Sequence, residues 1–85
     1  MKHYTYYTTG PCSSQIDLAI DDDGRIENVT FVGGCHGNTQ GISVLVKGMK
    51  MEDVVAKLEG IRCGYKNTSC PDQLARALRE VMSKD

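Results

Sequence analysis

The chain has 85 residues, with ten basic and eleven acidic side chains and a net charge of −1. This length suits one domain with a thin hydrophobic core, and we expect residues 1–85 to form that single domain. The balanced charge argues against a general attraction to nucleic acid or to anionic membranes. No apolar run is long enough to span a bilayer.

The N-terminal stretch 1–9 lacks the apolar core of a signal peptide, so we expect a cytoplasmic protein. The four cysteines would then lie in a reducing compartment, where metal ligands or reactive thiols are more common than disulfides. A small core also gains from a staple such as a metal ion, a disulfide or a partner subunit.

The first third of the chain predicts three antiparallel strands. Tyrosines that alternate with polar residues over 4–9 indicate the first strand, and the turn-forming residues 10–14 end it. A second strand follows in which three apolar residues alternate with their neighbours: Ile16, Leu18 and Ile20. The sequence Asp-Asp-Asp-Gly at 21–24 is typical of a hairpin turn.

The returning strand contains one irregularity. Ile26 is out of phase with Val29 and Phe31, so we expect a bulge near Glu27 or Asn28. The three strands together form an antiparallel meander.

Helical spacing begins after residue 38. The first helix, with Asn38 or Thr39 as its N-cap, has apolar residues at i, i+3, i+4 and i+7: Ile42, Leu45, Val46 and Met49. Gly48 should end it, and a second short helix repeats the pattern up to Gly60 with Met51, Val54, Val55 and Leu58. Strands followed by helices predict an α+β fold with the helices packed on one face of the sheet.

The last helix begins near the second pair of cysteines. Thr68 and Ser69 are suitable N-caps, Pro71 fits the first turn and Asp72 complements the helix dipole. The apolar residues of this helix are Leu74, Leu78, Val81 and Met82.

Each cysteine lies at a junction between predicted elements and outside their apolar patterns: Cys12, Cys35, Cys63 and Cys70. Cysteines that merely fill a core usually lie within such patterns, so these positions favour ligands. Cys70 opens the last helix, and a helix N-terminus favours the thiolate form. Four thiolates satisfy tetrahedral zinc or an iron–sulfur cluster.

Several alternatives stay open at this point. The chain has no Cys-x-x-Cys pair, which argues against a zinc knuckle and a thioredoxin-type dithiol. A disulfide between Cys63 and Cys70 is an alternative, and His36 is an alternative fourth metal ligand in place of Cys63. No cysteine has an obvious base partner, so we do not expect the chain to be catalytic alone.

The run Thr-Ser-Cys-Pro-Asp at 68–72 resembles the motif that gives the TSCPD-domain family its name. The stretches 34–42, 45–48 and 58–64 are also similar to its small stand-alone members, so the resemblance covers nearly the whole chain. Related domains are appended to adenosylcobalamin-dependent ribonucleotide reductases, and short members are sometimes labelled ribonucleoside-diphosphate reductase by that kinship. The resemblance implies an effector or interaction module with a nucleotide-linked reductase as its partner.

The order of the cysteines is also similar, more distantly, to NifU/IscU-type iron–sulfur scaffolds, which implies a NifU/IscU-like fold and iron–sulfur assembly proteins as partners. Three ligand positions of that family carry over to Cys12, Cys35 and Cys70. Scaffolds usually have Asp two residues after the first cysteine, where this chain has Ser14. Cys63 would then complete an all-thiolate site that holds its metal more permanently.

The sequence thus predicts a small metal-binding protein or accessory domain. Its ligands would be Cys12, Cys35, Cys63 and Cys70, around zinc or an iron–sulfur cluster. The alternative function is the reductase-associated interaction module.

Overall fold

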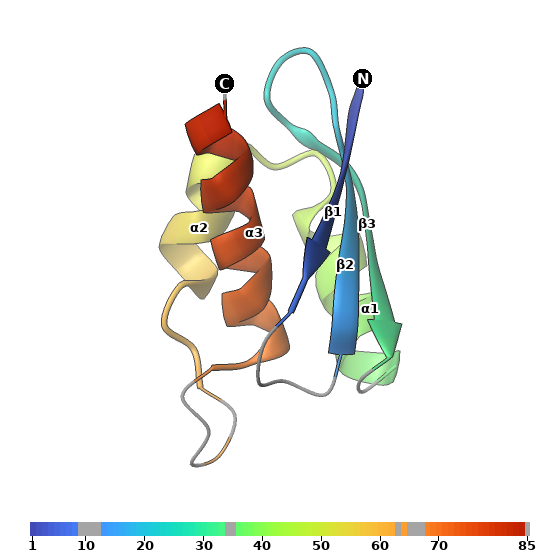
Figure 1. Ribbon diagram of the computed structural model, residues 1–85, viewed down its shortest axis with the longest axis vertical. Coiled ribbons are helices and arrows are strands. Elements are labelled where there is room, and N and C mark those ends of the chain that lie inside the picture. Colours follow the sequence, from blue (N-terminus) through green and yellow to red (C-terminus); the bar gives the residue numbers. More distant parts are fainter. Residues whose placement is uncertain (9–12, 34–35, 63, 65–67, 85) are drawn as a thin grey trace.

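The computed structural model describes residues 1–8, 13–33, 36–62, 64 and 68–84. Three strands precede three helices: β1 (Lys2–Tyr7), β2 (Ser13–Ile20), β3 (Ile26–Gly33), α1 (His36–Val46), α2 (Met51–Leu58) and α3 (Cys70–Lys84). The predicted α+β class and the order of its elements are confirmed (Figure 1).

The sheet is an antiparallel meander with the strand order β1-β2-β3. The hairpin between β2 and β3 is stabilised by Asp21, whose Oδ1 accepts hydrogen bonds from the backbone N–H groups of Asp23 and Arg25 at 3.0 and 2.9 Å. Gly24 has a φ of +79° in this turn, a conformation that glycine adopts without steric cost. The predicted hairpin turn is therefore confirmed.

The predicted bulge in β3 is also confirmed. Ala19 pairs with Asn28 and Ile20 pairs with Ile26, so Glu27 is the extra residue on β3. The extra residue brings Ile26 back to the core side, where it is 1 % exposed. A second irregularity, which the sequence did not predict, makes Ser14 the extra residue at the start of β2.

The core lies between one face of the sheet and the helices. Ile16 and Leu18 of β2 are buried against the apolar side of α3, which contributes Leu74 and Leu78. Helix α1 packs on β3, α3 on β2, and α2 on α3 (Figure 1). The predicted placement of helices on one face of the sheet is thus observed.

Helix α1 differs from its prediction in three respects, the first of which is that it ends at Val46 and so does not include Met49. It begins at His36, before the expected N-cap at Asn38 or Thr39. Leu45 was expected in its buried stripe but is 74 % exposed, whereas Thr39 is 5 % exposed. The buried stripe of α1 is therefore centred on Thr39 and Val46, and the apolar spacing misplaced Leu45 because it ignored polar residues as core-facing candidates.

Glycines end the first two helices as predicted. Gly48 and Gly60 have φ values of +86° and +88°, and each follows the last turn of its helix. No helix within the described residues has the length and apolar character needed to cross a membrane.

Candidate metal centre

The four predicted ligands divide between the described and undescribed parts of the chain. Cys70 is half-buried and is the first residue of α3. Cys12, Cys35 and Cys63 lie outside the described residues, as does the side chain of His36. The site is therefore built from the described neighbours of these residues.

The neighbours of Cys12 and Cys35 lie side by side on the sheet. Ser13, which follows Cys12, pairs with Gly33, which precedes Cys35 by two residues. The N–H of Thr8 donates a hydrogen bond of 3.2 Å to the carbonyl of Ser14, which holds the chain after β1 against the start of β2. The two segments that carry these cysteines thus leave the same end of the sheet.

The neighbours of Cys63 and Cys70 are joined by a direct hydrogen bond. The hydroxyl of Ser69, which precedes Cys70, donates to the carbonyl of Ile61 at 2.6 Å, and Ile61 precedes Cys63 by two residues. Ser69 is 5 % exposed and Ile61 is 41 % exposed, so this link lies at the boundary between the buried start of α3 and the surface. It fixes the segment after α2 to the start of α3.

Both pairs of neighbours lie at one end of the molecule. Figure 1 shows that β2 begins, β3 ends, and α1 and α3 begin at the end drawn at the bottom. A helix N-terminus carries partial positive charge from its unpaired N–H groups, and two helices begin here. Such an environment favours several thiolates in one place.

The start of α3 is capped as the sequence predicted. The hydroxyl of Ser69 accepts a hydrogen bond of 3.2 Å from the N–H of Asp72, three residues further on. This is the hydrogen bond that an N-cap serine makes with the N3 residue of its helix. Cys70 and Pro71 therefore occupy the first two helical positions.

Asp72 is the centre of a buried hydrogen-bond network that the sequence did not predict. Its Oδ1 accepts from the N–H of Gly60 at 2.7 Å, and its Oδ2 accepts from the hydroxyl of Thr68 at 2.5 Å. Arg76 Nε lies 3.1 Å from the same Oδ2. Asp72 is 3 % exposed, so its charge depends on these partners and not on water.

A second layer of hydrogen bonds supports Thr68. Gln73 is fully buried, and its Nε2 donates to the Thr68 hydroxyl at 2.9 Å. Every buried side-chain nitrogen or oxygen among the described residues has a hydrogen-bond partner. The network is therefore complete, as a buried polar cluster must be if it is to make the local structure rigid.

The network lowers the pKa of Asp72. Burial acts to raise this pKa, but the hydrogen bonds from Thr68 and Gly60 and the charge of Arg76 outweigh the burial, so the pKa lies below its ordinary value. The carboxylate is therefore ionised near neutral pH, and each of its two oxygens can accept a hydrogen bond.

The arrangement assigns different roles to the residues of the 68–72 run. Thr68, Ser69 and Asp72 are buried and make the hydrogen bonds that fix the start of α3. Cys70 is half-buried among them. A thiol held at the first position of a helix is well placed to act as a ligand or a nucleophile.

The described residues by themselves do not make a metal site. Within the described ranges, no three side chains of His, Cys, Asp or Glu gather as a metal ion would require. Three of the four predicted ligands lie outside those ranges, so the predicted cysteine set stays a prediction.

Sequence reasoning assigned Asp72 only to the helix dipole and missed its contact with Gly60. One signal was available, because a Thr or Ser followed by an acidic residue at the third or fourth position is typical of a capping motif. Gly60, in contrast, lies 12 residues before Asp72 in the sequence, and the tertiary structure brings the two together.

A comparison with protein-family models identifies the family of the chain. The family model of the TSCPD domain matches residues 1–82. The chain belongs to the TSCPD domain family. No curated protein and no solved structure matches it. In this member, three of the five residues in the run that spells TSCPD form the buried network at the start of α3.

Proposed function

We propose that this TSCPD domain is a small metal-binding protein or accessory domain of the cytoplasm, with Cys12, Cys35, Cys63 and Cys70 as the ligands of zinc or an iron–sulfur cluster. The observation that supports the proposal is the convergence of the described neighbours. Ser13 pairs with Gly33, and Ser69 is hydrogen-bonded to Ile61 at the same end of the molecule (Figure 1).

Elementary chemistry supports a metal over the other uses of four thiols. Zinc and iron–sulfur clusters both accept four thiolates, and the negative charge of such a set is stabilised where helices begin. The buried network around Asp72 would keep Cys70 in place without the metal. Ligands held in advance lose less entropy when the metal binds.

Retention is favoured over transfer of the metal. In the NifU-type scaffolds that the sequence resembles, an Asp stands where this chain has Ser14. The hydroxyl of Ser14 donates to the carbonyl of Val32 at 3.3 Å, so it bonds to the sheet. A site with four thiolates and no carboxylate in this position fits a structural zinc or a stable cluster better than a labile one.

Metal analysis of the purified protein tests the proposal. The protein is purified once aerobically and once anaerobically, without added metal, and zinc, iron and sulfide are measured together with the visible spectrum. We expect either stoichiometric zinc without colour, or iron and sulfide with thiolate-to-iron absorption. Sub-stoichiometric metal in both preparations, with four thiols that titrate readily, would contradict the proposal.

The second candidate function is an effector or interaction module for a ribonucleotide reductase, in which any metal is structural. The face of the sheet away from the helices favours it, because Tyr7 is 73 % and Val32 42 % exposed there. Exposed aromatic and aliphatic side chains are common in protein interfaces. Retention of the protein on an immobilised reductase, lost on Tyr7→Ser, would support this function, and equal retention of the variant would contradict it.

A further inference from the structure

The hydroxyl of Ser69 joins two segments that each carry a proposed ligand. It donates to the carbonyl of Ile61 at 2.6 Å and accepts from the N–H of Asp72 at 3.2 Å. Ile61 precedes Cys63 by two residues, and Cys70 directly follows Ser69. One oxygen atom therefore links the chain after α2 to the first turn of α3.

The burial of this hydroxyl fixes its orientation. A serine hydroxyl has a single proton to donate, and Ser69 is 5 % exposed, so that proton needs an acceptor within the protein. The carbonyl of Ile61 is that acceptor, while the N–H of Asp72 uses a lone pair of the same oxygen. The side chain is therefore held from both sides.

A second hydrogen bond supports the same connection. The N–H of Gly60 donates to Asp72 Oδ1 at 2.7 Å, one residue before Ile61. Protein atoms alone thus join the chain just before Cys63 to the start of α3. Closing a loop costs conformational entropy, and here part of that entropy is lost on folding, before any ligand binds.

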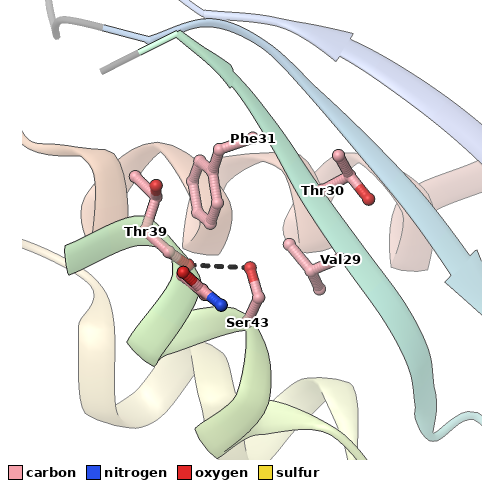
Figure 2. Close-up of a pocket in the computed structure, with 6 residues that line it drawn as sticks. Val29, Thr30, Phe31, Thr39 and Ser43 are labelled. Atoms are coloured by element: carbon pink, nitrogen blue, oxygen red, sulfur yellow. Dashed lines mark hydrogen bonds between the residues drawn. The ribbon is translucent and has the colours of Figure 1, made fainter. Parts of the chain in front are cut away.

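The start of α1 is held differently. There the hydroxyl of Ser43 donates to the carbonyl of Thr39 at 2.8 Å, a hydrogen bond that stays within one helix (Figure 2). Thr39 is 5 % exposed where α1 packs on β3, and with Val29 and Phe31 it lines the cleft between them. Ser43 therefore makes the same kind of bond as Ser69 without joining two segments.

We propose that Ser69 is a positioning residue for the thiols of Cys63 and Cys70, which it holds as a pair before any metal binds. The inference rests on the proposed function for the convergence of these two cysteines, because Cys63 lies outside the described residues. A tie between the two segments raises the effective concentration of one thiol beside the other. The pair should therefore bind a thiophilic centre through two sulfur atoms even without Cys12 and Cys35.

Capture of phenylarsine oxide tests the proposal without any metal. This reagent condenses with two thiols: two As–S bonds form, both thiol protons leave with the oxide oxygen as one water, and arsenic stays trivalent. The test uses the intact chain with Cys12→Ser and Cys35→Ser, so that only the pair remains. Competition with dithiothreitol measures the affinity, and we expect one reagent bound per chain.

Ser69→Ala in this background should weaken the capture by about fivefold, the factor that a typical hydrogen bond contributes to an equilibrium. Ser69→Gly should weaken it similarly. Glycine is tolerated at an N-cap, so this variant keeps the start of α3 and lacks the bond to Ile61. Ser69→Thr keeps the hydroxyl and should restore most of the affinity. Ser43→Ala is the matched control and should leave the affinity unchanged, because its bond joins no second segment.

Circular dichroism of each variant shows whether it is folded. Equal affinity in folded Ser69→Ala or Ser69→Gly would overturn the proposal, as would a parent chain that does not capture the reagent with both thiols. Equal weakening by Ser43→Ala would also overturn it, since the effect would then belong to any lost hydroxyl. Capture that depends on Ser69, in a protein whose intact form holds neither zinc nor a cluster, would leave the positioning role in place and contradict the proposed function alone.

Discussion

The hydroxyl of Thr68 donates a 2.5 Å hydrogen bond to the buried carboxylate of Asp72. This bond joins the first and last residues of the run that names the family, and it encloses the position of Cys70. Since Gly60 bonds to the other oxygen of the same carboxylate, Asp72 also ties the end of α2 to the start of α3. The run therefore fixes the start of α3, with Cys70 as its first residue, against the end of α2.

Replacement of Asp72 should destabilise the fold strongly. Asp72→Ala leaves the buried hydroxyl of Thr68 and the part-buried N–H of Gly60 without their acceptor, and we expect a loss of about 2 kcal/mol in the free energy of unfolding. Urea denaturation measures it. The matched control is Asp23→Ala at the exposed hairpin, where the change should stay within about 0.5 kcal/mol. Equal losses in the two variants would show that the network contributes little.

The same carboxylate should make the fold sensitive to acid. The pKa of Asp72 is lowered from its ordinary 3.8, so the folded state binds a proton less readily than the unfolded state does. Its contribution to stability is fully present above the unfolded value and is lost as the pH falls through the folded value.

Urea unfolding as a function of pH measures this contribution. The free energy of unfolding of the wild type should fall more steeply below about pH 4 than that of Asp72→Asn, which lacks the titrating group. Other carboxylates titrate in both proteins, so the difference between the two curves isolates Asp72. Curves that remain parallel through this range would contradict the assignment.

The sheet could be predicted from the sequence because its information is local. The alternation of Ile16, Leu18 and Ile20 predicts the buried face of β2. The break in alternation between Ile26 and Val29 predicts the bulge at Glu27. Helix α1 was harder, because Thr39 is buried there and Leu45 is exposed. Apolar spacing alone therefore misplaces the core-facing side of this helix, because the packing on β3 selects Thr39 and leaves Leu45 in solvent.

The candidate site could be predicted only in part. The N-cap at Ser69 follows from local sequence, and it is observed. The bond between Gly60 and Asp72 is a property of how two helices pack, and no local pattern encodes it. For Cys12, Cys35 and Cys63 the structure describes neighbours, so their convergence on one ligand set remains a prediction.

Gly60 should be important for its backbone conformation and for its hydrogen bond. Its φ is +88° and a Cβ atom would meet nothing within 4 Å, so Gly60→Ala should cost about 1 kcal/mol through the backbone alone. A further loss should come from misalignment of the N–H that donates to Asp72. Urea denaturation of the variant measures the sum.

A double-mutant cycle separates the two effects. Gly48 has a φ of +86° and equally open surroundings, but its N–H donates to the carbonyl of Ile26. In the Asp72→Ala background, Gly60→Ala should cost less than in the wild type, whereas Gly48→Ala should cost the same in both. Equal costs for Gly60→Ala in the two backgrounds would mean that its hydrogen bond to Asp72 adds nothing.

The role of Cys63 can be decided by the rate of metal loss. If four cysteines bind the metal, Cys63→Ser and Cys70→Ser should each speed its release to a chelator by at least about tenfold. Loss of a residue that only hydrogen-bonds to a ligand already lowers metal affinity by about that factor, so loss of a ligand itself should do at least as much. Ser83→Ala, which removes an exposed hydroxyl near the C-terminal end of α3, is the control and should release metal at the wild-type rate.

If Cys63→Ser retains metal like the wild type while His36→Ala loses it, the fourth ligand is His36, and the all-thiolate site is wrong. The outcome also bears on retention, because a neutral imidazole in place of a thiolate leaves one negative charge fewer at the helix N-termini and weakens the hold on the metal.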